Sequence, residues 1–524
     1  MQNISTPDIA APAPTGASLI AAISPQFFAA TIFLLVGSAT LLSCLFATGG
    51  HPVYTLDDPY IHLALAERIA LGHYGINLGE VTSPSSSVIW PLLLVAGAGT
   101  WFHEYVPLAI NLACGVTTAI LFGHFAQNLP LGDADPTRHA KQLGIAGLLV
   151  LAGNLVGLAF TGMEHSLQVL LAAAAAHGMI EAWRGRPIPA WAIAAAMIGP
   201  AVRYEMLAVT LAMAIALAAQ RRRLAACDTV LASLAAPALF AAFLVWNGNL
   251  ALPNSVLAKL NAVDAETSFF SRLLMQVSVY DLGPKLVMWI MLAVTAAAAY
   301  RASGVKRFVL AGVGLAIVMH FVLGRFGWFY RYELYAIVFC GLVVLRAASD
   351  VWPKTEHLAG AVLLICAVFY LPPLINTPTA SANVYEQQHQ MGRFVREHYR
   401  KPFAVNDLGL VSFKLDPHIY VLDLYGLASN EAVRQRNKSP QWLDDVTRRH
   451  GAGLAIVYDE WFEEFPRSWR RVATMRLASR RITPASDHVA FFATAVGDAT
   501  EIRRALAEFK AGLPPGVELE LMVP

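Results

Sequence analysis

Charged residues are scarce in this sequence. Asp, Glu, Lys and Arg make up 14% of the 524 residues and hydrophobic residues 56%, whereas soluble domains carry about 25% charged residues. Most of the chain is therefore expected to lie in lipid. The net charge of +2 gives no reason to expect a nucleic-acid partner. The first 26 residues contain no Lys or Arg, so a cleavable signal peptide is not expected, and residues 1–26 are predicted to form a flexible tail.

Cysteine and several enzyme signatures are lacking as well. All five cysteines lie in apolar segments, and none lies in the hydrophilic C-terminal part, which argues against a disulfide framework or a Cys-based metal site. The chain has no Gly-rich phosphate loop, no catalytic-triad spacing and no internal repeat. These absences leave the distribution of the few charged residues as the main guide to function.

The sequence instead contains long apolar runs. A membrane-spanning helix needs about 17 to 25 mostly apolar residues. Eleven segments are candidates: 27–48, 105–128, 142–160, 165–183, 189–203, 205–219, 227–246, 285–300, 307–323, 333–347 and 357–373. Residues 88–102 are also apolar, but Pro91 and the short length indicate a surface or re-entrant helix. The sequence therefore predicts a mostly helical, polytopic membrane domain over residues 27–375, with a first outer loop at 49–104.

The basic residues predict the orientation of these spans, because cytoplasmic loops collect Lys and Arg. With the N-terminus inside and eleven spans, the triplet Arg221-Arg222-Arg223 lies on the cytoplasmic side. The loop carboxylates then lie on the outer side, and so does everything after the last span. In a bacterium, this protein would be a multi-pass inner-membrane protein with its C-terminal part in the periplasm.

Residues 376–524 change in character and predict a soluble α/β domain. Short apolar runs at 403–406, 418–422, 454–458 and 489–492 are typical of buried strands, and 441–450 and 500–511 have helical patterns. Alternating strands and helices are typical of an α/β domain.

Two adjacent carboxylates, Asp57 and Asp58, follow the first span. Carboxylates at a membrane surface are costly unless they meet a cation, a metal or a substrate. They are candidates for the catalytic base. The alternative is that Asp57 only caps a helix that begins at Pro59, since Asp is a favoured N-cap and Pro a favoured first helical residue.

Four cations, Lys259, Arg203, Arg325 and Arg331, are expected on the same outer side. They are candidates for binding the phosphate of a lipid-linked donor, because Arg binds phosphate oxygens in a bidentate manner. The alternative is mutual neutralisation with a neighbouring carboxylate, Arg203 with Glu205 and Arg331 with Glu333. A base, phosphate-binding cations and a lipid surface together suit sugar transfer from a lipid-phosphate donor.

Several short motifs carry a family resemblance. In chain order they are Asp57-Asp58-Pro59-Tyr60, Gly72-His73-Tyr74-Gly75, Thr82-Ser83-Pro84, Thr161-Gly162-Met163-Glu164, Arg203-Tyr204-Glu205, Leu252-Pro253-Asn254-Ser255 with Ala258-Lys259, and Arg331-Tyr332. Over about residues 27–375 the sequence resembles the GT-C type of polytopic glycosyltransferase, nearest to the cell-wall arabinofuranosyltransferase branch. The C-terminal part, with the run from Val421 to Leu427, resembles the outer domain of that branch.

The resemblance implies an inverting transfer from a polyprenyl-phosphate sugar to an acceptor glycan or glycolipid, with the base at Asp57 or Asp58. It implies a second acidic site at Glu164, and a divalent cation (Mg²⁺ or Mn²⁺) held by Asp58 and Glu164 is one option. Further substrate-binding candidates in or beside the motifs are Tyr60, His62, Glu205 and Asn254.

The sequence departs from the branch at positions that would contact substrate. Pro59 stands where Ala is usual, Ala64-Leu65 where Arg-Tyr is usual, and Arg203-Tyr204-Glu205 where Arg-Pro-Glu is usual. These departures leave the sugar open. The alternative function is a transporter or flippase of lipid-linked sugars. Because transporters commonly show internal repeats and charges at mid-membrane depth, the sequence favours the enzyme.

Overall fold

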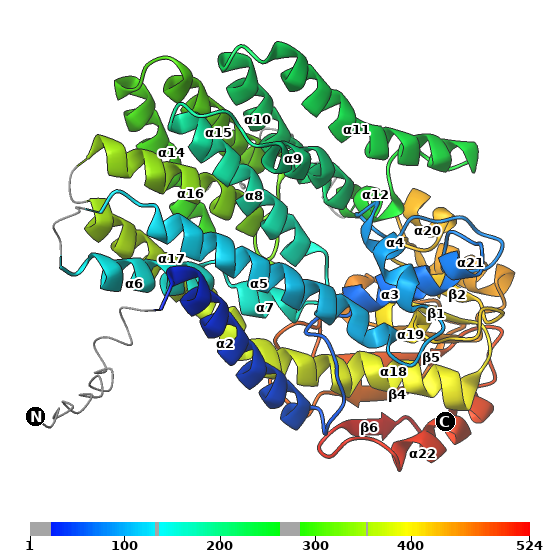
Figure 1. Cartoon of the computed structure of the whole chain (residues 1–524). Coiled ribbons are helices and arrows are strands. Elements are labelled where there is room, and N and C mark those ends of the chain that lie inside the picture. The colour runs from blue at the N-terminus through cyan, green and yellow to red at the C-terminus, as the bar shows by residue number, and fades with distance from the viewer. Residues whose placement is uncertain (1–22, 132–135, 262–282, 353–354, 524) are drawn as a thin grey trace, which may run out of the picture.

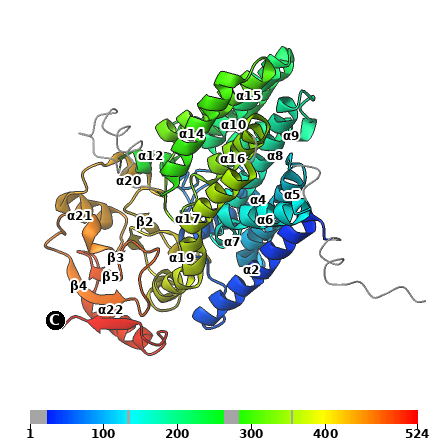
Figure 2. The same cartoon turned by 90° about the vertical axis from the view of Figure 1, so that its left-hand side faces the viewer.

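The structure is a computed structural model that describes residues 23–131, 136–261, 283–352 and 355–523. The expected N-terminal tail lies almost entirely in residues 1–22, outside the described residues. The chain is mostly helical and ends in a small sheet, which lies at one end of the helical bundle (Figures 1 and 2). The predicted fold class is confirmed.

The helical part contains every segment that the sequence predicts to be a span (Figure 1). The helices are α2 (Pro25–Ala47), α5 (Val106–Gln127), α6 (Arg138–Ala152), α7 (Leu155–Ala159), α8 (His165–Trp183), α9 (Ala190–Val202), α10 (Leu207–Ala219), α11 (Arg223–Trp246), α14 (Gly283–Arg301), α15 (Val305–Leu323), α16 (Leu334–Val351) and α17 (Thr355–Val384). Within the described residues, eight helical stretches are long and apolar enough to cross a membrane by length and composition, and two more are apolar but shorter.

The apolar run at 88–102 contains only short helical pieces, α4 (Trp90–Leu94) and η1 (Val95–Gly97). Helix α3 (Asp58–Ala70) precedes them. Pro59 lies in its first turn, where a fixed φ and a missing N–H suit a helix start. The segment between α2 and α5 therefore contributes α3 and short helical pieces at the end of the bundle that meets the sheet, and no helix in it is long enough to cross a membrane.

The sheet has the strand order β2-β1-β3-β5-β4-β6. Strands β1 (Phe403–Val405), β2 (Val421–Asp423) and β3 (Leu454–Val457) are parallel, and β5 (His488–Ala493), β4 (Arg470–Arg476) and β6 (Glu518–Leu521) complete it in antiparallel fashion. The four strands expected from apolar runs are present, and so are the two helices, as α21 (Pro440–Arg449) and α22 (Ala499–Lys510). The sequence missed β4 and β6, because arginines flank β4 and β6 has only two apolar residues.

One long helical segment joins the two parts. Helix α17 continues without a break through η4 (Tyr385–His389), α18 (Gln390–Phe394) and η5 (Val395–Tyr399) into the sheet. Figure 1 shows this segment, in yellow, running from the bundle along the sheet.

The loop between α2 and α5, predicted to be the first outer loop, is held against the sheet. Asn77, on this loop, lies beside the edge strand β2; its Nδ2 donates to the carbonyl of Val421 at 2.9 Å and its Oδ1 accepts from the N–H of the same residue at 2.9 Å. The Nη2 of Arg68 donates to the carbonyl of Leu415 at 2.8 Å. The buried face of α3, with Tyr60 and Leu63, shares a hydrophobic core with the sheet. Because of these contacts, the two adjacent carboxylates at the start of α3 lie against the C-terminal part of the chain.

Candidate functional site

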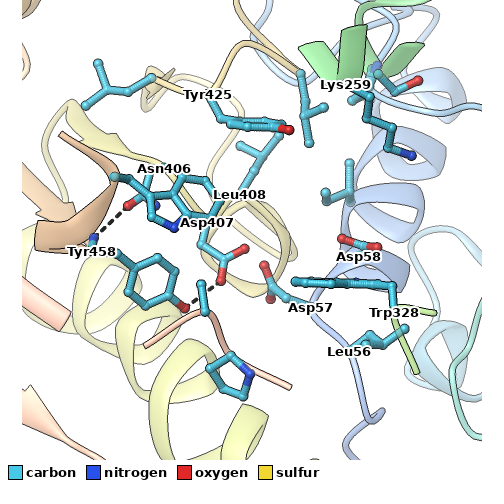
Figure 3. A pocket seen from close by; sticks show the side chains of 18 of the residues that line it. Leu56, Asp57, Asp58, Lys259, Trp328, Asn406, Asp407, Leu408, Tyr425 and Tyr458 are labelled. Carbon is cyan, nitrogen blue, oxygen red and sulfur yellow. Dashed lines mark hydrogen bonds between the residues drawn. The ribbon is translucent and has the colours of Figure 1, made fainter. Parts of the chain in front are cut away.

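A cavity of about 1670 Å³ lies where the helical part meets the sheet. Its lining includes the start of α3, loops at one end of the bundle, Gln388 of η4, and the segments that follow the parallel strands (Figure 3). The polar and aromatic lining residues used below are Asp57, Asp58, His62, Arg203, Lys259, Arg325, Trp328, Arg331, Tyr332, Gln388, Asn406, Asp407, Tyr425, Tyr458 and Trp461. The cavity thus contains both expected carboxylates and all four expected cations.

Three of these cations surround the ring of Tyr332, in the loop between α15 and α16. The charged groups of Arg331, Arg203 and Lys259 lie 5.0, 5.6 and 5.8 Å from the ring centroid. Burial alone would raise the pKa of the Tyr332 phenol, but the cations, Arg331 first, outweigh it and lower the pKa to about 8. A phenol that ionises this easily indicates a strongly positive potential in this half of the cavity.

Arg331 has donors to spare. Its side chain is 2% exposed, and Nη2 pairs with the Asp58 carboxylate at 2.5 Å and donates to the Tyr332 hydroxyl at 3.1 Å. Within the described part of the chain, its buried Nε and Nη1 find no hydrogen-bond partner. Unpaired buried donors are costly, and a bound anion with two oxygens would satisfy both.

Arg203, in contrast, is already satisfied. Its donors bind Glu205 at 2.7 Å, Glu164 at 2.9 Å and the Ser86 hydroxyl at 3.0 Å. The expected alternative of neutralisation by Glu205 is therefore present, with Glu164 as a second partner. The Nε2 of His62 lies 3.9 Å from the other Glu164 oxygen. This buried network supports the wall of the cavity. Arg203 adds positive charge to the cavity, but its hydrogen-bond donors are already bonded within the protein.

Lys259 and Arg325 lie next to each other in the cavity lining. The Nη2 of Arg325 donates to the backbone carbonyl of Lys259 at 3.0 Å. The ammonium of Lys259 has no ion-pair partner among the residues that the structure describes, and it points into the cavity (Figure 3). Lys259 is therefore available to an anionic ligand beside Arg331.

The two neighbouring carboxylates differ in environment. Asp57 is 8% exposed and accepts from the N–H groups of Gly409 at 2.6 Å and Leu410 at 2.8 Å, at the start of α19 (Gly409–Ser412). It makes no capping bond to its own helix, so the capping alternative is wrong. A Cβ on Gly409 would overlap the carboxylate of Asp57, and only glycine permits this approach. Asp58 is 36% exposed and lies on the cavity side, paired with Arg331.

The pKa values of the Asp57 and Asp58 carboxyls are also shifted in opposite directions. Burial raises the pKa of Asp57 well above its usual value, and the negative charge of Asp407 adds to this. Burial also raises the pKa of Asp58, but Arg331, with help from Lys259 and His62, outweighs it, and the net pKa is lowered. Asp58 is thus a stable anion, while Asp57 holds its proton more strongly.

Asp407 is a site residue that the sequence reasoning missed. It accepts from the Nε2 of Gln388 at 2.8 Å and the hydroxyl of Tyr458 at 2.9 Å, and it shares a hydrogen bond with Asp57. Burial raises its pKa. The available signal was its position directly after β1, because ligands bind at the carboxyl ends of parallel strands. Tyr425 and Tyr458 follow β2 and β3 at the same edge.

Three expected substrate contacts lie elsewhere. Tyr60, Glu205 and Asn254 are all described by the structure, but none of them lines the cavity. Tyr60 is fully buried, and its hydroxyl accepts from the N–H of Tyr54 at 3.2 Å. Asn254, 2% exposed, donates to the Asn430 side chain at 3.0 Å. The packing of α3 and α12 (Asn254–Asn261) against the sheet part accounts for both positions.

A divalent cation does not fit Asp58 and Glu164 well. Each carboxylate is already paired with an arginine, Arg331 and Arg203 respectively. Within the described ranges, no group of three or more His, Cys, Asp and Glu side chains could hold a metal ion. Hard cations prefer several oxygen ligands free of other charges, so no chemical step below involves a metal.

The loop that carries Arg331 has an unusual backbone. Trp328, Phe329 and Tyr330 have φ of 49°, 61° and 53°, a left-handed conformation that costs roughly 1–2 kcal/mol per non-glycine residue. The loop is held by a hydrogen bond from the N–H of Gly327 to Glu333 at 3.1 Å. It places the Trp328 ring beside Asp57 and Asp58 (Figure 3).

Comparison with known proteins gives limited matches. A family model described as a domain of unknown function (DUF8728) matches residues 382–492, from the end of α17 into β5. No curated protein matches the sequence. Two solved structures are similar over most of the chain. The archaeal oligosaccharyltransferase AglB from Archaeoglobus fulgidus, in complex with an inhibitory peptide and a dolichol-phosphate, is 12% identical, and the match covers 81% of this chain and 69% of that one with a TM-score of 0.42.

The second structure is ArnT from Cupriavidus metallidurans in the apo state, with 11% identity, 89% of this chain and 98% of that chain covered, and a TM-score of 0.42. TM-scores this low carry no argument about function. Neither protein is described as an arabinofuranosyltransferase, so that branch of the sequence resemblance stays a prediction. The chain is similar to these two structures in outline, and its function has to be inferred from its own cavity.

Proposed function

We propose that this protein is a membrane glycosyltransferase that moves a sugar from a polyprenyl-phosphate donor to an acceptor hydroxyl, with inversion at the sugar carbon. One observation carries the proposal: carboxylates from the first loop and cations from three later loops meet in a single cavity next to the apolar helices. Within it, a strongly positive half adjoins an acidic half. This division suits a reaction in which a phosphate leaves and a hydroxyl attacks.

The positive half would hold the donor phosphate. Arg331 offers two unpaired buried donors. Lys259 adds a second positive charge, with its ammonium 5.8 Å from the centroid of the Tyr332 ring. When the bond between the sugar carbon and the phosphate oxygen breaks, its electron pair goes to the phosphate. Preformed cations stabilise that developing charge without reorganisation. Arg203 would strengthen the field while its own hydrogen bonds stay with Glu164 and Glu205.

The acidic half would accept the proton of the acceptor hydroxyl, whose oxygen forms the new bond to the sugar carbon. General bases of this kind typically contribute about 10²–10⁴-fold to the rate. Asp57 and Asp58 are the candidates from the first loop. In the predicted topology this side of the bundle faces the periplasm, so donor and acceptor would meet on the outer face of a bacterial inner membrane.

The test is a transfer assay with purified protein in lipid nanodiscs. A panel of polyprenyl-phosphate sugars is offered with candidate glycan and glycolipid acceptors, and products and free polyprenyl phosphate are measured by mass spectrometry. We expect release of polyprenyl phosphate with one donor class, and loss of that release in Arg331→Met. Arg184→Met is the matched control, because Arg184 lies at the C-terminal end of α8, whereas Glu164 of the cavity wall lies at the N-terminal end of the same helix.

The same assay separates transfer from transport. A flippase would move the intact lipid-linked sugar across the bilayer and release no polyprenyl phosphate. Binding of the donor without any release, over the whole panel of donors and acceptors, would contradict the proposed enzyme.

A further inference from the structure

The acid half of the cavity contains a pair of carboxyls from distant parts of the chain. Asp57 precedes α3, and Asp407 follows β1; their carboxyl groups face each other (Figure 3), and a hydrogen bond between them is one cause of the shift in each pKa. Neither has an arginine or lysine as an ion-pair partner among the described residues. The contact exists because α19 packs on the start of α3, where Gly409 and Leu410 donate to Asp57.

Two facing carboxylates that are largely buried do not both ionise at neutral pH, because like charges repel and burial disfavours each charge. The pair then retains one proton and titrates as a unit. Three titratable groups face it: Asp58 and Tyr60 on α3, and Tyr458 after β3. The cations Arg331 and Lys259 lower the pKa of Asp58. The pair of Asp57 and Asp407 therefore holds a proton more strongly than Asp58 does.

Unsatisfied polar atoms beside the pair indicate a ligand. Gln388 is 2% exposed and Asn406 is 5% exposed, and both line the cavity. Within the described residues, the Oε1 of Gln388 and the Nδ2 of Asn406 have no hydrogen-bond partner, although the opposite end of each amide is bonded, to Asp407 and to the N–H of Tyr458 respectively. A buried acceptor and a buried donor left open next to a carboxyl pair suit the hydroxyls of a sugar.

Aromatic rings continue this surface. Trp461 is 42% exposed, and its ring centroid lies 5.3 Å from that of Tyr425 and 5.7 Å from that of Tyr458. Exposed rings beside hydroxyl-binding amides form a surface suited to the apolar face of a sugar. Tyr425 follows β2, and Tyr458 and Trp461 follow β3.

We infer that Asp407 and Asp57 act together as the base, and that this unit takes the proton from a sugar hydroxyl of the acceptor. The inference rests on the proposed function and deepens it. The acceptor oxygen bonds to the sugar carbon of the donor, the electron pair of the broken bond leaves with the phosphate, and the proton passes to the singly charged pair, which becomes neutral. Asp58 keeps its charge as the partner of Arg331. The C-terminal sheet thus supplies part of the catalytic centre.

The test compares the pH dependence of transfer in wild type, Asp407→Asn and Asp416→Asn. Asp416 lies on the same part of the chain but not in the cavity lining. In Asp407→Asn we expect kcat to fall at least tenfold with little change in KM for the donor, because general bases contribute about 10²–10⁴-fold. The acidic limb of the profile should also move to lower pH, since Asp57 loses its negative neighbour. Asp416→Asn should match wild type. A wild-type rate and limb in Asp407→Asn would overturn the inference and leave the proposed transfer intact.

A second readout needs no substrate. Below about pH 4, the ordinary Asp value, the pair is neutral in folded and unfolded chains alike. As pH rises, the unfolded chain loses both protons while the folded pair holds one, so stability falls until the raised folded value is passed. We expect Tm to drop less between pH 5 and pH 8 in Asp407→Asn than in wild type. Equal drops would overturn the shared proton even if the protein transferred no sugar at all.

Discussion

The most direct check on the site is the ionisation of Tyr332. Its phenol is 9% exposed, and burial alone would place its pKa above the ordinary value of 10. Three cations within 5.0–5.8 Å of the ring bring it instead to about 8. A shift of this size corresponds to about 3 kcal/mol of net stabilisation of the phenolate. The cavity should therefore hold one tyrosine that ionises well before the others.

The assay follows phenolate absorbance in the ultraviolet while pH is raised. We expect an early phase worth one of the 16 tyrosines, centred near pH 8 and absent in Tyr332→Phe. Burial raises the pKa of Tyr425 in the same cavity, so Tyr425→Phe should keep the early phase and serves as the control. In Arg331→Met the phase should move to higher pH, because Arg331 is the largest of the charges that oppose burial.

The same titration reports on ligand binding. A lipid phosphate bound to Arg331 and Lys259 would neutralise part of the positive field, and the pKa of Tyr332 would rise. By linkage, affinity for the phosphate must weaken as pH rises through 8. If no phenol ionises below about pH 9, or if the early phase survives in Tyr332→Phe, the convergence of the cations is refuted.

Three further predictions test neighbouring contacts. Arg331→Lys should raise KM for the lipid-phosphate donor, because a point charge cannot replace two aligned donors; Arg203→Met should instead mainly lower stability in denaturant titrations, by about 3–5 kcal/mol, because it leaves the buried Glu164 and its neighbour Glu205 without their counter-charge. Gly409→Ala should lower stability by about 1–3 kcal/mol through overpacking against the first-loop carboxylate and abolish transfer, whereas Gly144→Ala, where a Cβ meets nothing, should leave both unchanged or slightly raise stability. Asn77→Ala leaves the N–H and the carbonyl of Val421 in edge strand β2 without their Asn77 partner, at a cost of about 1–3 kcal/mol each. The variant should therefore be cut in the first loop by limited proteolysis. Resistance equal to wild type would show that these hydrogen bonds do not hold the loop on the sheet.

The sequence alone was sufficient for the helical part. In lipid, the backbone N–H and C=O groups of a run of about 20 apolar residues find hydrogen-bond partners within the run only if it is helical. The composition of a short window therefore predicts each of these helices without knowledge of its neighbours. The four most apolar strands of the sheet were found for a similar reason, since each is a short buried run. Strands β4 and β6 were missed because pairing with β5 and with each other defines them more than their own residues do.

The site was only half predictable. Asp57, Asp58, Lys259, Arg331 and the other cations could be named, because a charge at a membrane edge needs a reason for its position. Which charge meets which could not. Arg331 and Asp58 are 273 residues apart in the sequence, and the nearest carboxylate in the chain, Glu333, was the expected alternative.

Tertiary structure decided the roles of the two adjacent carboxylates. In the sequence they are equivalent neighbours after a span. In the fold, Asp58, the first residue of α3, points toward the cations, and Asp57, directly before the helix, points toward the start of α19 and Asp407. Sequence patterns report what each residue needs from its surroundings, such as lipid, water or an opposite charge. The partner that meets the need is set by how distant segments pack, because side-chain charges act over a few ångströms in space and not along the chain.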